Sequence, residues 1–231
     1  MLKLAIWDMD GTIVDSREVI TTAMARAFEA CGLAPPAYAQ TRTIVGLALD
    51  EACRRLAPAG TSQQTLAQLV EAYRAAFIAR RTEPGFIEPL YEGAQHALAR
   101  LAGDGWLVAM ATGKSRRGIE AIFDMHPLSD YFDTIHCADD GPGKPHPAMI
   151  DAALARVGAE PHQAVMIGDA VFDMQMGRAA NVHCLGVSWG FGEADELESA
   201  GAHAVHHSFE TLNADVDAFA IRLMIGAHGE S

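Results

Sequence analysis

From Tyr91 to about residue 187, short apolar runs alternate with stretches of helical periodicity. The apolar runs predict strands at 106–111, 134–137, 164–167 and 182–187, and the periodic stretches predict helices at 93–102, 115–125, 146–157 and 172–180. Strands that alternate with helices predict a parallel sheet joined by right-handed crossovers. A sheet of this kind binds its ligand outside the carboxyl ends of its strands, where the strand order switches. The chain is therefore expected to be an α/β protein with its site at that edge.

A further apolar run, residues 4–7, stands near the start of the chain and ends in Asp8-Met9-Asp10-Gly11-Thr12. The run fits a strand that is buried on both faces. Two carboxylates at the end of such a strand are costly unless a cation lies between them. Mg²⁺ suits the position, because it prefers oxygen ligands and commonly takes one or two carboxylates together with phosphate. The alternative is an acidic turn in which Gly11 supplies the bend.

Residues 16–88 interrupt the alternation directly after this first strand. Their apolar side chains recur at helical spacing, for example over 19–31 and 66–77, and no strand pattern is present. We expect an all-helical domain at 16–88 inserted into an α/β core made of 1–15 and 89–231. Linkers near Val14 and Pro89 would join the two domains, and the apolar stripes of the insert are assigned to its own core.

Three later stretches add the chemistry that a phosphoryl-transfer site needs. Thr112 closes one predicted strand, and Lys144 lies in the loop Gly-Pro-Gly-Lys-Pro. Asp169 closes another predicted strand and is followed by Asp173 four residues later, one helical turn on. Together with the first-strand carboxylates they supply a nucleophile, metal ligands, a hydroxyl and a cation.

These four motifs, in this order, resemble those of the haloacid dehalogenase superfamily, and in particular its phosphoglycolate phosphatase-like members. The motifs span most of the chain, from Asp8 to Asp173. The resemblance implies a three-layer, Rossmann-like parallel-sheet core with an all-helical cap between the first and second motifs. This arrangement agrees with the insert that the periodicity predicts independently.

The resemblance also implies catalytic roles. Asp8 would attack phosphorus and form an aspartyl-phosphate. Asp10 would protonate the leaving oxygen and later deprotonate the attacking water. Thr112 would hold a phosphoryl oxygen, and Lys144 would neutralise the charge shared by Asp8 and the phosphate. As a loop residue, Lys144 is expected to contribute little to the stability of the core.

Substrate binding is assigned to backbone groups and to one cap residue. The N–H groups of Met9, Asp10 and Gly113 would hold the phosphoryl oxygens, with help from a helix N-terminus. Arg42 lies in Thr-Arg-Thr-Ile-Val-Gly, which looks like the substrate loop of the cap in phosphoglycolate phosphatase relatives. Lys114 stands at the start of a predicted helix, where a solvated face and a substrate contact are both open.

The expected metal is Mg²⁺, bound by the Asp8 carboxylate, the Asp10 backbone carbonyl and the Asp169 carboxylate, with water completing the shell. Asp173 is expected to orient a metal-bound water or Lys144. The predicted function is hydrolysis of small phosphorylated metabolites, of the phosphoglycolate or sugar phosphate type.

Several alternatives are weighed against this function. Dehalogenases lack the second aspartate, which is present here as Asp10. Phosphonoacetaldehyde hydrolase needs a cap lysine, and no lysine occurs between Lys3 and Lys114. A β-phosphoglucomutase-like mutase would need a cap histidine and lysine, which are also missing. Two non-enzymatic functions stay open, namely a phospho-aspartate switch and a phosphate-binding protein without turnover.

Composition limits the partners and the compartment. The formal net charge of −13, from 30 acidic and 17 basic residues, argues against nucleic acid. No apolar run approaches the length of a membrane span. The four cysteines form no Cys-x-x-Cys pair, and no charged-then-apolar signal region opens the chain. We therefore expect a cytoplasmic protein with a small phosphorylated substrate, and the oligomeric state is left open.

Overall fold

The computed structural model describes residues 2–228 and contains a parallel sheet with the strand order β3-β2-β1-β4-β5-β6. The predicted α/β fold is thereby confirmed. The strands span Leu4–Trp7 (β1), Leu107–Ala111 (β2), Thr134–His136 (β3), Ala164–Gly168 (β4), His183–Val187 (β5) and Ala204–His206 (β6).

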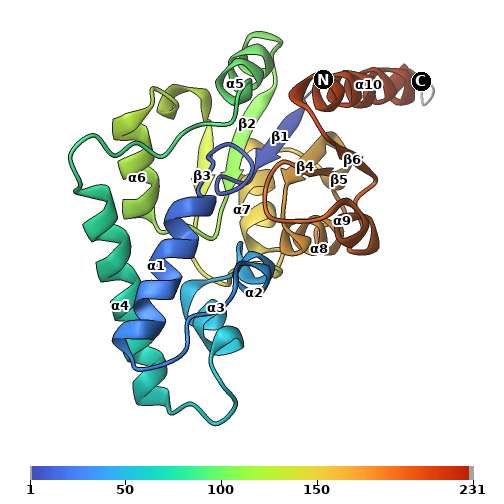
Figure 1. Cartoon of the computed structure of the whole chain (residues 1–231). Coiled ribbons are helices and arrows are strands. Elements are labelled where there is room, and N and C mark those ends of the chain that lie inside the picture. The colour runs from blue at the N-terminus through green and yellow to red at the C-terminus, as the bar shows by residue number, and fades with distance from the viewer. Residues whose placement is uncertain (1, 229–231) are drawn as a thin grey trace.

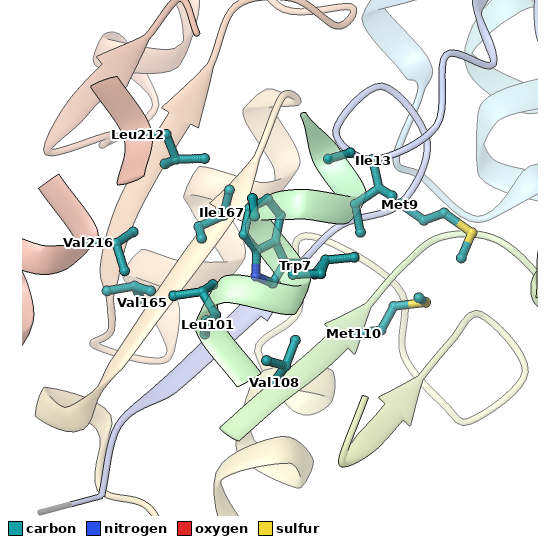
Figure 2. Close-up of a cluster of buried hydrophobic side chains, with 14 of the residues drawn as sticks. Trp7, Met9, Ile13, Leu101, Val108, Met110, Val165, Ile167, Leu212 and Val216 are labelled. Carbon is teal, nitrogen blue, oxygen red and sulfur yellow. The ribbon is translucent and has the colours of Figure 1, made fainter. Parts of the chain in front are cut away.

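Helices cover both faces of the sheet (Figure 1). The side chains of β1 alternate, so that Ala5 and Trp7 enter one hydrophobic cluster while Leu4 and Ile6 enter another. Figure 2 shows the first cluster, where Trp7 lies among side chains from neighbouring strands and helices. The first face is covered by α5 (Ala94–Gly103), α6 (Arg116–Met125) and α10 (Phe209–His228), and the second by α7 (Ala148–Val157) and α8 (Val171–Ala179). The short elements η2 (Ser129–Tyr131), η3 (Pro161–Gln163) and α9 (Ala194–Ser199) complete this part.

All regular secondary structure between β1 and Leu90 is helical, as the sequence predicts. It consists of α1 (Arg17–Ala30), α2 (Tyr38–Thr41), η1 (Arg42–Ile44), α3 (Leu49–Leu56) and α4 (Gln63–Arg81). These helices lie to one side of the sheet in Figure 1 and share a hydrophobic cluster of their own. Phe172 and Phe191 enter the same cluster from the sheet side. We call residues 16–88 the cap from here on, and the division into two domains stays a prediction.

The two segments that lead into and out of the cap lie side by side. Val14 forms an antiparallel bridge with Leu90. The Asp15 N–H donates to the Pro89 carbonyl over 2.8 Å, and the Tyr91 N–H donates to the Ile13 carbonyl over 3.0 Å. The chain therefore leaves the sheet and returns to it through a single paired strip of backbone.

The strand order reverses between β1 and β4. The chain runs from β1 outward through β2 to β3, and then returns to the other side of β1 as β4. The carboxyl ends of adjacent parallel strands meet at one edge, so Asp8, Thr112 and Asp169 are brought to the same crevice. This is the edge at which the sequence predicts a site.

Among residues 2–228, no helix is long and apolar enough to cross a membrane. The cysteines Cys31, Cys53, Cys137 and Cys184 are all free.

Candidate active site

Asp8 is held by a continuation of the sheet. Its backbone N–H donates to the Ile167 carbonyl over 3.0 Å, so the pairing of β1 with β4 extends one residue past β1. The Asp8 side chain is almost fully buried. Burial raises the pKa of Asp8 to about 7, although Lys144 opposes the shift, and Asp173 and Asp10 add to it. The carboxylate predicted to be the nucleophile thus stands in a water-poor position.

Lys144 forms the cationic centre of the site. Its Nζ lies 2.7 Å from Asp8 Oδ1 and 2.6 Å from Asp173 Oδ1, and all three side chains are buried. Burial acts against the lysine charge, but Asp173 and Asp8 outweigh it and raise the pKa of Lys144. The side chain is therefore a fixed ammonium group next to the predicted nucleophile. The sequence treats Lys144 as a loop residue that contributes little to the core, whereas its side chain lies buried between two carboxylates, which leads us to expect a larger contribution.

Asp169 is fixed by two donors. Thr12 Oγ1 donates to its Oδ1 over 2.8 Å, and the Phe191 N–H donates to its Oδ2 over 2.7 Å. Burial and the nearby charges of Asp8 and Asp173 raise the pKa of Asp169. Two groups in the described part of the chain thus hold this carboxylate in one orientation.

Asp8, Asp169 and Asp173 each offer an oxygen, and these three atoms lie within 4.8 Å of one another. Asp173 is expected from the sequence to orient a metal-bound water or Lys144, and its Oδ1 does contact Lys144, while the residue also lies among the possible metal ligands. The Ala170 N–H donates to Asp173 Oδ2 over 3.0 Å, which fixes the side chain at the start of α8. Three buried carboxylates around one lysine make a site that a hard cation can occupy.

Glycines permit this close packing. Gly11 has φ of +84°, and a Cβ atom there would overlap the Asp169 carboxylate. A Cβ atom at Gly190 would overlap the same carboxylate and the Gly11 carbonyl. Gly11 is part of the first motif, but nothing in the sequence pattern distinguishes Gly190 in the loop that follows β5.

Asp10 is engaged by Lys114, whose role the sequence leaves open. Lys114 Nζ lies 2.8 Å from Asp10 Oδ1 and 3.9 Å from Glu88 Oε2, and it stands 5.2 Å from the centre of the Phe77 ring. Glu88 is buried and accepts a hydrogen bond of 2.6 Å from Arg81 Nε at the end of α4. Glu88 and Arg81 had no predicted role, because the approach of Lys114 to Glu88 joins residues 26 positions apart in the chain.

A cavity of about 550 Å³ opens in front of these groups. The sheet side contributes Asp8, Asp10, Thr112 and Gly113, and residues of α1, η1, α3 and α4 form the opposite wall. Thr112 is buried, and its Oγ1 accepts a hydrogen bond of 3.2 Å from the Lys114 N–H. The structure thus places Asp8, Asp10 and Thr112 at the cavity, while Lys144, Asp169 and Asp173 gather around Asp8 without lining it.

Two residues predicted to bind substrate, Met9 and Arg42, have side chains that do not line the cavity. The Met9 side chain is buried in the core, and its carbonyl accepts from the N–H groups of residues 12–14. Arg42 is not among the residues that line the cavity. Its guanidinium group binds both Glu196 carboxylate oxygens at 2.8 and 2.9 Å, as well as the Phe191 carbonyl at 3.2 Å. Arg42 therefore joins the cap to the sheet side. Its role in substrate binding stays a prediction.

Comparison with known proteins agrees with this geometry. A family model described as haloacid dehalogenase-like hydrolase matches residues 5–187. The chain is 30% identical over 92% of its length to "Probable phosphatase IndB" of Dickeya dadantii, of which it covers 92%. It is 28% identical over 88% of its length to a "Phosphoglycolate phosphatase" of Nitrosococcus oceani, of which it covers 91%. A crystal structure of a predicted phosphatase from Clostridium acetobutylicum has a TM-score of 0.82 and 25% identity, with 94% of this chain and 98% of that chain covered. The chain belongs to the haloacid dehalogenase-like hydrolases.

Proposed function

We propose that this hydrolase is a Mg²⁺-dependent phosphatase that acts on small phosphorylated metabolites through an aspartyl-phosphate at Asp8. The observation that carries the proposal is the buried contact of Lys144 with both Asp8 and Asp173, next to Asp169 and at the base of the cavity. The phosphatase names of relatives that match along most of their length support the same reaction class.

The residues fit a magnesium ion. The available donors are carboxylate oxygens, and three buried carboxylates face one lysine, which leaves negative charge uncompensated. Burial raises the pKa of Asp8 and of Asp169, and the neighbouring carboxylates add to the shift. The Asp8 and Asp169 carboxylates and the Asp10 carbonyl would hold the ion. When bound, Mg²⁺ would polarise the phosphoryl group and compensate its charge.

The proposed reaction has two steps. Asp8 attacks phosphorus, the P–O bond to the alcohol breaks, and Asp10 gives its proton to the departing oxygen. A water molecule then attacks the phosphoryl group on Asp8, with Asp10 accepting a proton, and inorganic phosphate is released. Lys144, Thr112 and the backbone N–H groups of Met9 and Gly113 stabilise the phosphoryl oxygens throughout.

The first test measures phosphate release from p-nitrophenyl phosphate with and without divalent metal. We expect turnover with Mg²⁺, no turnover after chelation, and inhibition by Ca²⁺, whose looser coordination disturbs the in-line geometry. Full activity after exhaustive chelation would contradict the metal assignment. Stoichiometric labelling of Asp8 without multiple turnover would instead indicate a phospho-aspartate switch.

For the alcohol part of the substrate, the family resemblance suggests phosphoglycolate and sugar phosphates. A cytoplasmic location likewise remains an expectation from the sequence. The lining of the cavity bears directly on the choice of alcohol.

A further inference from the structure

We infer that the preferred substrate is a phosphate monoester of a bulky, largely apolar alcohol, larger than glycolate and without a carboxylate. The inference rests on the proposed phosphatase function, because it concerns the part of the substrate beyond the phosphoryl group. Three properties of the cavity lead to it, namely its size, its apolar wall and the pairing of its cations.

The size of the cavity exceeds what phosphoglycolate needs. Its volume of about 550 Å³ lies within the roughly 300–1,000 Å³ of sites that bind drug-sized ligands. Phosphoglycolate has only two carbon atoms beyond its phosphate, so it would leave most of this space to water. A larger alcohol would fill the space and exclude that water from the reacting groups.

The helix α4 presents an apolar surface to the cavity. Tyr73, Phe77 and Ile78 all line it, and the rings of Tyr73 and Phe77 lie 5.7 Å apart. Ile78 is 41% exposed, which leaves an apolar side chain uncovered at the wall of the site. Covering apolar surface is favourable by about 25 cal/mol per Å², so an apolar alcohol would gain affinity here.

Two other cap segments extend this surface. Ile20 and Met24 of α1 line the cavity, and so do Val45, Leu47 and Leu49 in and after the turn that follows η1. Apolar side chains from three separate parts of the cap thus converge on the space above the phosphoryl site. A polar sugar or a carboxylate would lose water against these aliphatic side chains, which offer no hydrogen bonds in return.

Two of the cations that line the cavity are already committed to protein carboxylates. Lys114 binds Asp10 at 2.8 Å and lies 3.9 Å from Glu88. Arg81 donates to Glu88 over 2.6 Å and lies over the Phe77 ring. Binding a substrate carboxylate with either side chain would require one of these internal pairs to break.

The two remaining lining cations lie on α4 and α6. Arg74 binds Glu71 at 2.6 Å, whereas Arg117 has no hydrogen bond or ion pair to any residue in the 2–228 range. Asp50 and Asp139 line the cavity as well and would repel a carboxylate. The charge around the cavity therefore favours a neutral alcohol, with Arg117 and, through its exposed pair, Arg74 as the side chains that could oppose this preference.

The experiment compares kcat/KM for ethyl phosphate, 2-phenylethyl phosphate and phosphoglycolate in the presence of Mg²⁺. Ethanol and 2-phenylethanol are both primary alcohols, so their phosphates differ in apolar bulk more than in chemical reactivity. We expect 2-phenylethyl phosphate to exceed each of the other two by about tenfold or more.

A matched pair of variants tests whether the cap wall causes the preference. Ile78→Gln should lower the ratio of 2-phenylethyl to ethyl phosphate kcat/KM several-fold, because it makes the wall polar at similar size. Ile87→Gln is the control, since Ile87 is 61% exposed and lies outside the cavity, and this variant should keep the wild-type ratio. Thermal melting of both variants would verify that they fold.

The outcomes separate this inference from the function on which it rests. Absence of hydrolysis for every ester, p-nitrophenyl phosphate included, would overturn the proposed function and the inference together. Hydrolysis of p-nitrophenyl phosphate with phosphoglycolate at least as good as 2-phenylethyl phosphate would overturn the inference alone. Loss of such a phosphoglycolate preference in Arg117→Gln would then identify Arg117 as the carboxylate-binding residue. An unchanged ratio in Ile78→Gln would refute the role of the α4 surface.

Discussion

At the scale of single residues, the Lys144 ammonium group holds two carboxylates that would otherwise repel each other. Asp8 follows strand β1 and Asp173 lies in the first turn of α8, and each contacts Lys144 within 2.7 Å. Replacing one member of a buried ionic group leaves the others uncompensated, which commonly costs about 3–5 kcal/mol. We therefore expect Lys144 to affect the stability of the folded state as well as the proposed reaction.

Lys144→Ala should reduce turnover by about 10²-fold or more, because a preorganised charge next to the phosphoryl group is lost. It should also lower the free energy of unfolding, measured by urea denaturation without metal. Lys3→Ala is the control, since Lys3 is remote in the fold and donates to the Asp104 carbonyl at an exposed position. Unchanged turnover in Lys144→Ala would exclude this lysine from the site.

Asp8→Asn and Asp10→Asn should fail at different points. The first removes the nucleophile, so no phosphoenzyme should form. The second removes proton transfer, which is worth about 10²- to 10⁴-fold. Single-turnover bursts should show that Asp10→Asn slows phosphorylation less with p-nitrophenyl phosphate than with an alkyl phosphate, because p-nitrophenolate needs little protonation. Equal losses with both substrates would show that Asp10 is not the general acid.

The sequence predicted this site unevenly. Asp8, Thr112 and Asp169 could be placed together because strand ends in a parallel sheet share an edge. The contacts of Thr12 and Gly190 with Asp169 could not be predicted, since they depend on how the loops after β1 and β5 pack against Asp169 in the folded chain. The burial of Lys144 was missed for the same reason.

At the scale of elements, local periodicity located the strands β2 to β5 and the helices α5 to α8 to within about two residues. The prediction for 164–167, for example, compares with Ala164–Gly168 for β4. The strand order could not be predicted from the sequence, because pairing between β1 and β4 joins segments about 160 residues apart. No prediction was made for the short strand β6, which extends the sheet beyond β5, or for the helix α10, which covers one face.

Arg42 and Glu196 link η1 of the cap to α9 at the sheet side. We expect Arg42→Ala and Glu196→Gln to cause similar changes in kcat, because each breaks the same contact. The double variant should then resemble either single one, as the effects of a shared contact are not additive. A rise in KM with Arg42→Ala alone, and not with Glu196→Gln, would favour the substrate-binding role predicted from the sequence.

At the scale of the whole molecule, the cap supplies the apolar wall of the cavity and the sheet supplies the reacting groups. Under the proposed function, the reacting groups and the side chains that select the substrate therefore lie in different parts of the chain. We expect substrate exchange to need movement of the cap away from the sheet, as lids move in many enzymes.

Replacing residues 16–88 by a short linker should keep slow hydrolysis of p-nitrophenyl phosphate and remove discrimination among alcohols. The remaining core retains Asp8, Asp10, Lys144 and Asp169, whereas the apolar wall is lost. Circular dichroism and melting would establish that the shortened chain folds. A folded core with the wild-type ranking of alcohols would show that the cap does not select the substrate.

The paired strip that joins Val14 to Leu90 has a consequence for how such enzymes diversify. The segments that enter and leave the cap lie against each other, so any insert is attached to the sheet through two adjacent ends. The entropic cost of closing a loop grows slowly with its length, so inserts of very different size fit the same two ends. A cap from a relative with another substrate could be spliced at this strip, and the phosphoryl-transfer groups would keep their positions in the recombinant protein.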